Sequence, residues 1–128
     1  MQAEKSTPII VGNNNTSEHF KSHFEGAGKF LDLMHKGDDL KKSGNYAEAI
    51  EVYKQGLEQY AYSRPEQAGA MDSIAMTYEE MGNFDEAAKY YDLASEVTMN
   101  ENRRASLSQK ATTLYQKSRE ISANHGSE

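Results

Sequence analysis

An internal repeat constrains the fold of this chain more than any other feature of its sequence. Residues 43–56, SGNYAEAIEVYKQG, are followed by a second copy at residues 81–94, MGNFDEAAKYYDLA. Gly44 corresponds to Gly82 and Tyr53 to Tyr91, so the offset is 38 residues at both positions. Repetition at a fixed period is typical of architectures that stack copies of one small unit. We therefore expect a repeat architecture.

The apolar residues around both copies recur at intervals of three and four, the period of an amphipathic helix. Such stripes cover residues 30–40, 46–60, 71–81, 84–97 and 107–121. Gly44 and Gly82 follow the first and third stripes, and glycine accepts the left-handed conformation that ends many helices. Asn45 is a candidate N-cap, and Pro65 suits the first turn of a helix. The sequence thus predicts five helices.

Helices joined by short Gly-Asn turns form antiparallel hairpins, and hairpins of this kind stack to bury their apolar faces. We expect an all-α fold: a right-handed α-solenoid of two hairpins, closed by a fifth capping helix with a polar outer face. The predicted boundaries are a flexible N-terminal arm at 1–26, a helical domain at 27–122 and a polar tail at 123–128. Within the arm, the apolar run at 9–11 is a candidate to dock in a groove.

Each unit of the repeat carries a small residue on its first helix and an alanine followed four residues later by tyrosine on its second. The first unit has Leu33, Gly37 and Leu40, then Ala49 and Tyr53, and the second has Met71, Ala75 and Tyr78, then Ala87 and Tyr91.

This pattern resembles the tetratricopeptide repeat, which has a period of about 34 residues. The resemblance covers roughly residues 30–99. Lys36 replaces an expected leucine, Leu40 an expected tyrosine, and Ala61 and Met99 stand where the repeat closes with proline. The resemblance implies that the small positions mark close helix contacts and that the first helix of each hairpin lines a concave groove.

Carried over to this chain, that geometry predicts a peptide groove of nine residues. They are Met34, Asp38, Lys41, Asp72, Met76, Glu79, Ser108, Thr112 and Tyr115. Met34 and Asp38 stand where the family's carboxylate clamp needs Lys and Asn, which argues against a C-terminal carboxylate as ligand. Acidic side chains favour a basic partner, and methionines adapt to irregular apolar shapes. We expect a protein or peptide partner with a basic or amphipathic segment.

Composition restricts the other classes of function. The net charge is −6, with 20 acidic and 14 basic residues, which disfavours nucleic acid and anionic membrane surfaces as partners. Cysteine is absent, and neither a signal-peptide core nor a spanning segment is recognisable, so we expect a cytoplasmic protein. His19 and His23 are spaced like a metal pair on one helix face, but the zinc-protease pattern is not met, and we interpret both as solvated.

Three hypotheses remain open. The first is a non-catalytic adaptor or scaffold that binds a peptide segment in its groove. The second is a structural protein that forms a homodimer through Leu107, Leu114 or Ile121, because two hairpins make a short array. The third is an enzyme, which is disfavoured because no nucleophile set, phosphate loop or metal cluster is recognisable, and no cofactor is expected.

Overall fold

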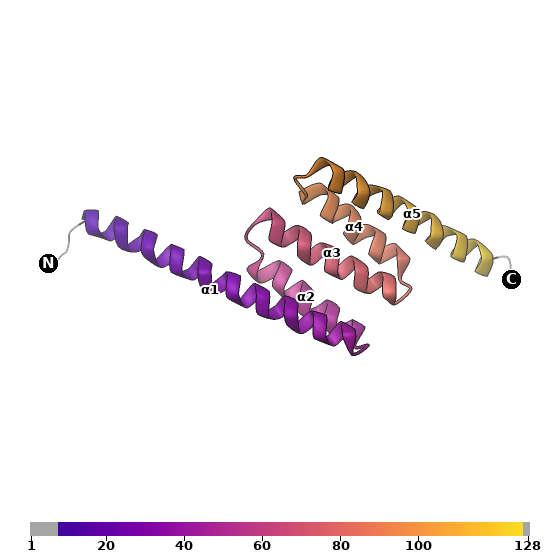
Figure 1. The fold of residues 1–128 in the computed structure, drawn as a ribbon, viewed down its shortest axis with the longest axis horizontal. Coiled ribbons are helices and arrows are strands. Elements are labelled where there is room, and N and C mark those ends of the chain that lie inside the picture. The colour runs from indigo at the N-terminus through magenta and orange to yellow at the C-terminus, as the bar shows by residue number, and fades with distance from the viewer. Residues whose placement is uncertain (1–7, 127–128) are drawn as a thin grey trace.

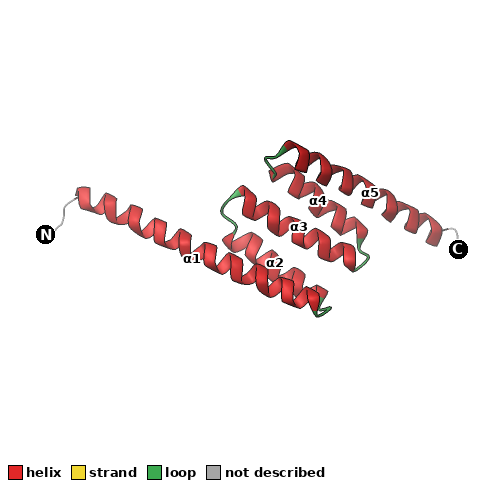
Figure 2. Ribbon diagram, in the orientation of Figure 1, coloured by secondary structure: helices red, strands yellow, loops and turns green. Residues whose placement is uncertain are grey.

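The computed structural model describes the backbone of residues 8–126 and the side chains of residues 25–123. Five helices follow one another within this range: α1 (Pro8–Lys42), α2 (Tyr46–Tyr60), α3 (Arg64–Glu80), α4 (Phe84–Val97) and α5 (Glu101–Gly126) (Figure 1). Only short connections separate them, and the described part of the chain contains no strand (Figure 2). The prediction of an all-α fold with five helices is confirmed.

The helices pack in the order in which they occur along the chain. Helix α2 contacts α1 and α3, and α4 contacts α3 and α5. The structure is therefore two helical hairpins, α1–α2 and α3–α4, with α5 packed against the second (Figure 1). The N-terminal part of α1, which has 35 residues against 15 in α2, extends beyond the other helices.

Two glycines form the tight turns within the hairpins. Gly44 and Gly82 have φ angles of 83° and 82°, in the left-handed region that glycine adopts without a steric penalty. Both asparagines that follow them occupy N-cap positions, as predicted for Asn45. Only Asn83 caps with its side chain, whose Oδ1 accepts a hydrogen bond from the Glu86 amide, whereas the Asn45 side chain makes no such bond.

The connection between the hairpins contains a capping box that the sequence reading missed. The Ser63 hydroxyl accepts a hydrogen bond from the Glu66 amide, and the Glu66 carboxylate accepts one from the Ser63 amide. This reciprocal pair satisfies two backbone donors that would otherwise lack partners at the start of α3. Pro65 lies in the first turn of α3, as predicted, where its missing amide hydrogen is not needed.

The core follows the repeat. Tyr53 and Tyr91, at equivalent positions of the two units, are both fully buried. Each lies among small residues: Ala49 shares a buried cluster with Tyr53, and Ala87 shares one with Tyr91. Gly37 is buried directly beneath the Tyr53 ring. The expectation that small residues allow close helix contacts is confirmed, and the tyrosines are core residues.

The ends of the first and last helices differ from the sequence prediction. Helix α1 begins at Pro8, not near Ala27, and α5 continues to Gly126, beyond the expected start of a polar tail at Ala123. A periodic apolar stripe appears in the sequence only where a helix packs against another helix. A helix once nucleated by packing can extend through polar sequence, because each added residue gains its own backbone hydrogen bond. The predicted arm at 1–26 therefore overlaps α1 from Pro8 onward, and residues 1–7 lie outside the described range.

Candidate peptide-binding surface

Ion pairs join α1, α3 and α5 into one layer. Lys41 Nζ of α1 lies 3.1 Å from a Glu80 carboxylate oxygen of α3. Two further pairs join α3 to α5. Arg103 Nη2 lies 2.8 Å from an Asp72 oxygen, and Lys110 Nζ lies 3.9 Å from a Glu79 oxygen.

The partners in these two pairs are spaced seven residues apart on both helices, so α3 and α5 run parallel. Helices α2 and α4 form the other layer, since each contacts two odd-numbered helices. We call the exposed side of α1, α3 and α5 the odd-helix face.

All nine predicted groove residues belong to α1, α3 and α5 at positions that are exposed or half-buried, and seven of them lie outside the apolar clusters of the core. Met76 is 40% exposed near the middle of α3 and is the main apolar side chain among them. Ser108 and Thr112 are exposed on α5, where the Thr112 hydroxyl donates to the Ser108 carbonyl. The other four are Asp38, Lys41, Asp72 and Glu79.

Met34 and Tyr115 are placed differently from the other seven. The end of the Met34 side chain lies over Gly56 of α2, and Met34 packs against the buried cluster around Tyr53. Tyr115 packs against the cluster around Tyr91. Its pKa is raised, first by burial and then by three carboxylates of α4, among them Asp92. Both side chains therefore face the even-numbered helices.

Two of the predicted carboxylates are anchored by the core tyrosines. The Tyr53 hydroxyl donates a hydrogen bond to Asp38, and the Tyr91 hydroxyl donates one of 2.8 Å to Glu79. Burial raises the pKa of both phenols, and the hydrogen bond to a carboxylate raises it further. Each tyrosine thus fills the core with its ring and orients a carboxylate of the odd-helix face with its hydroxyl.

The sign of the more exposed charge in each ion pair changes across this face. In the Arg103–Asp72 pair the arginine side chain is 56% exposed and the aspartate 22%, so the cation is turned to solvent. In the Lys41–Glu80 pair the lysine is 20% exposed and the glutamate 45%, so the carboxylate is turned outward. The face is therefore acidic toward α1 and cationic toward the start of α5.

Sequence reasoning missed the ion-pair partners Glu80, Arg103 and Lys110. Arg103 follows Asp72 by 31 residues, and no local pattern joins them. Only the parallel packing of α3 and α5 brings them together. The groove that the sequence predicted to be acidic is, in the structure, a face with paired charges of both signs.

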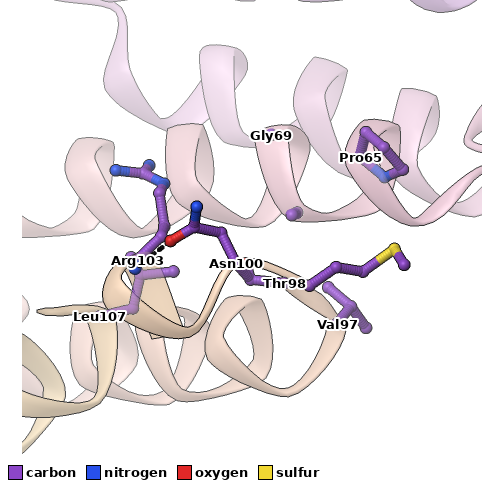
Figure 3. A pocket seen from close by; sticks show the side chains of 9 residues that line it. Pro65, Gly69, Val97, Thr98, Asn100, Arg103 and Leu107 are labelled. Carbon is purple, nitrogen blue, oxygen red and sulfur yellow. Dashed lines mark hydrogen bonds between the residues drawn. The ribbon is translucent and has the colours of Figure 1, made fainter. Parts of the chain in front are cut away.

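A cavity of about 310 Å³ opens beside the cationic end of the odd-helix face (Figure 3). It lies between the first two turns of α3, the connection from α4 to α5, and the start of α5. Arg103 is the only charged residue of its lining, and its side chain extends from α5 toward α3. The lining residues are Pro65, Ala68, Gly69, Val97, Thr98, Met99, Asn100, Arg103 and Leu107.

Stacked helical hairpins with a parallel layer of first helices define a helical-repeat protein. A sequence model of the tetratricopeptide repeat family matches residues 31–99, which is more than half of the chain. The chain belongs to the tetratricopeptide repeat family. No curated protein matches the sequence.

Family membership gives the general type of activity. Tetratricopeptide repeats are in general modules for protein–protein interaction and are typically non-catalytic. Among the described residues, no helix is long and apolar enough to cross a membrane, and no group of three or more His, Cys, Asp or Glu side chains could hold a metal ion. The side chains of His19 and His23 lie outside the described range.

Proposed function

We propose that this protein is an adaptor or scaffold that binds a basic or amphipathic segment of a partner protein on its odd-helix face, and that it acts without catalysis. The observation that carries the proposal is the exposed Met76 of α3, which lies one helical turn from the outward carboxylate of Glu80 on the face that also presents Asp38 of α1. A flexible thioether surrounded by anionic groups suits an apolar side chain flanked by Lys or Arg.

The ion pairs of this face permit such a role because each of them is weak enough to be exchanged for a pair with a partner. Surface pairs of this kind contribute only about 0–1 kcal/mol each to stability. A partner's lysine or arginine can therefore approach Glu80 without a large cost for disturbing its pair with Lys41. The carboxylate of Asp38 keeps its orientation through the buried Tyr53, which reduces the entropy lost on binding.

The test uses the whole chain and a synthetic amphipathic peptide of alternating Lys-Lys and Leu-Leu pairs. The double variant Asp38→Asn/Glu80→Gln removes two charges from the face, while the amide oxygen introduced by the first change can still accept the Tyr53 hydrogen bond. Its matched control, Glu51→Gln/Glu58→Gln, removes two exposed charges from α2. We expect titration calorimetry to show binding weakened about tenfold in the first variant and little in the second. Equal affinities for the two variants would rule out binding through this face.

The second candidate is self-association, favoured by the exposed Leu31 of α1 and Ile121 of α5. The structure corrects two of the three residues first assigned to a dimer face, because Leu107 and Leu114 are buried against α4 within the core. Multi-angle light scattering distinguishes the candidates. A mass that stays at 14.3 kDa across concentration excludes a dimer.

A further inference from the structure

The cavity near the start of α5 has the lining of an anchor site for one apolar side chain. Apolar side chains and backbone dominate its wall, with Leu107 at its base and Pro65 on the α3 side. Gly69 leaves the wall open, since a Cβ added there would meet nothing within 4 Å. Met99, largely exposed, borders the cavity with a side chain that can adapt to an occupant. Cavities of about 150 Å³ already accommodate benzene, so about 310 Å³ suffices for a phenyl ring and its attachment.

The charges around the cavity indicate which type of residue flanks that apolar side chain in the partner. Arg103 donates one hydrogen bond to Asp72 through Nη2, and its other guanidinium donors have no partner in the described part of the chain. A guanidinium has five N–H donors in all, so several remain for a carboxylate of a partner. Arg64 and Arg104 lie in the first turns of α3 and α5 but do not line the cavity, and the Arg104 guanidinium donates to the Thr98 carbonyl.

The nearby carboxylates weaken the positive potential at the cavity only in part. Glu66 accepts hydrogen bonds from the backbone and hydroxyl of Ser63 in the capping box. Asp72 is mostly covered by its pair with Arg103. Glu101, in the first turn of α5, is exposed and does not line the cavity. The charge presented at the cavity itself is therefore that of Arg103.

The cavity and the acidic end of the odd-helix face lie at a defined separation along α3. Gly69 and Glu80 are eleven residues apart, which corresponds to about 16 Å along the helix axis. An extended chain covers that distance in about five residues.

We propose that this cavity anchors a phenylalanine-sized side chain flanked by an acidic residue in the partner segment, about five extended residues from the basic residues that face Asp38 and Glu80. This inference rests on the proposed function and adds the register and the anchor of the bound segment. It describes one partner segment with an acidic-aromatic end and a basic end.

The test is NMR spectroscopy of the full-length chain with ¹³C-labelled methionine methyl groups. The Met99 signal reports binding at the cavity, and the Met76 signal reports binding on the odd-helix face. The probe is the acetylated and amidated peptide Asp-Phe-Asp-Ser-Gly-Ser-Gly-Lys-Lys, together with its reversed sequence, because the direction of binding is not assigned. Capped ends exclude a terminal carboxylate as the recognised group. We expect one of the two peptides to shift both the Met99 and Met76 signals.

Matched peptides and variants test the apolar anchor and the acidic residues that flank it one at a time. A Phe-to-Ser peptide and the cavity-filling variant Gly69→Phe should each weaken binding at least tenfold, whereas Gly69→Ala, which leaves the cavity open, should not. Changing the two peptide aspartates to asparagine should weaken binding about fivefold in the natural chain and not in Arg103→Gln. Thermal melting by circular dichroism checks that each variant is folded.

Failure of the anchor and failure of the proposed function would give different results. If the Phe-to-Ser peptide binds equally well, or if neither peptide shifts Met99 at millimolar concentration, the anchor is refuted, while a shift of Met76 alone would still support the proposed function. A further peptide lacks the two lysines of the parent. If it binds as tightly as the parent and shifts the Met99 signal, the anchor stands and the basic-partner function fails.

Discussion

Replacing Gly37 by alanine tests how closely α1 and α2 are packed. A Cβ at residue 37 would lie 2.4 Å from Cε1 and 2.6 Å from Cδ1 of Tyr53, where ordinary contact begins at 3.4 Å. The Tyr53 ring cannot move aside easily, because it is fully buried and its hydroxyl is hydrogen-bonded to Asp38. Relief of the clash must therefore shift a helix or break that hydrogen bond.

The expected magnitude combines two opposing effects. Overpacking a close-packed interior costs about 1–3 kcal/mol. Replacing glycine by alanine within a helix returns roughly 0.5–1 kcal/mol through backbone entropy. We expect Gly37→Ala to lower the free energy of unfolding by about 1–2 kcal/mol. Gly69→Ala on α3, where the added Cβ meets nothing within 4 Å, should raise it by about 0.5–1 kcal/mol.

Urea unfolding followed by circular dichroism at a helix band measures both changes. A shared slope with urea concentration would show that the midpoints report stability alone. Gly56→Ala is an intermediate control, because its nearest contact is the mobile end of Met34 at 2.7 Å, and we expect a change near zero. In a Tyr53→Leu background the cost of Gly37→Ala should fall, since the obstructing ring is gone.

One result would refute the reasoning. If Gly37→Ala stabilised the protein by as much as Gly69→Ala, the tyrosine ring would not restrict residue 37. The small residue at this repeat position would then reflect something other than the close approach of two helices.

Three further predictions follow from the turns, caps and core. Ser63→Ala should lower stability by about 1 kcal/mol through loss of the capping bonds with Glu66, and an unchanged urea midpoint would contradict this. Gly82→Ala should cost about 1–2 kcal/mol because its φ of 82° is unfavourable for alanine, and equal melting temperatures would exclude strain at this turn. Burial and a carboxylate hydrogen bond raise the pKa of Tyr53 and Tyr91 above the ordinary 10.0, so folding favours their neutral forms. Stability from this source is complete below about pH 10 and falls as pH rises further, and a double substitution of both tyrosines by phenylalanine should flatten this fall in urea titrations.

Local patterns in the sequence were sufficient for the helices and turns of the repeat. The spacing of apolar residues predicted each packed stripe, and Gly44 and Gly82 predicted both turns, because these are properties of a few neighbouring residues. The start of α1 at Pro8 was not predictable in this way. The sequence before residue 27 carries no sustained apolar period of three and four, which is the signal that predicted the other helices.

The candidate surface was predicted in part. The sequence and the resemblance it carries assigned Asp38, Asp72, Met76 and Glu79 to the helices that now form the odd-helix face. The cavity was missed because its wall is drawn from α3, α5 and the connection that precedes α5, and Gly69 contributes by lacking a side chain.

By itself, the sequence determined the repeat unit, its turns and the small residues that let its helices approach, because short-range sterics and periodic burial govern all of these. Only the tertiary structure decided which charges face outward. Asp72 and Arg103 meet across 31 residues of chain because α3 and α5 lie parallel, and the outward group in each ion pair follows from that packing. Electrostatic character depends on distances between side chains, and those distances exist only after the hairpins have stacked.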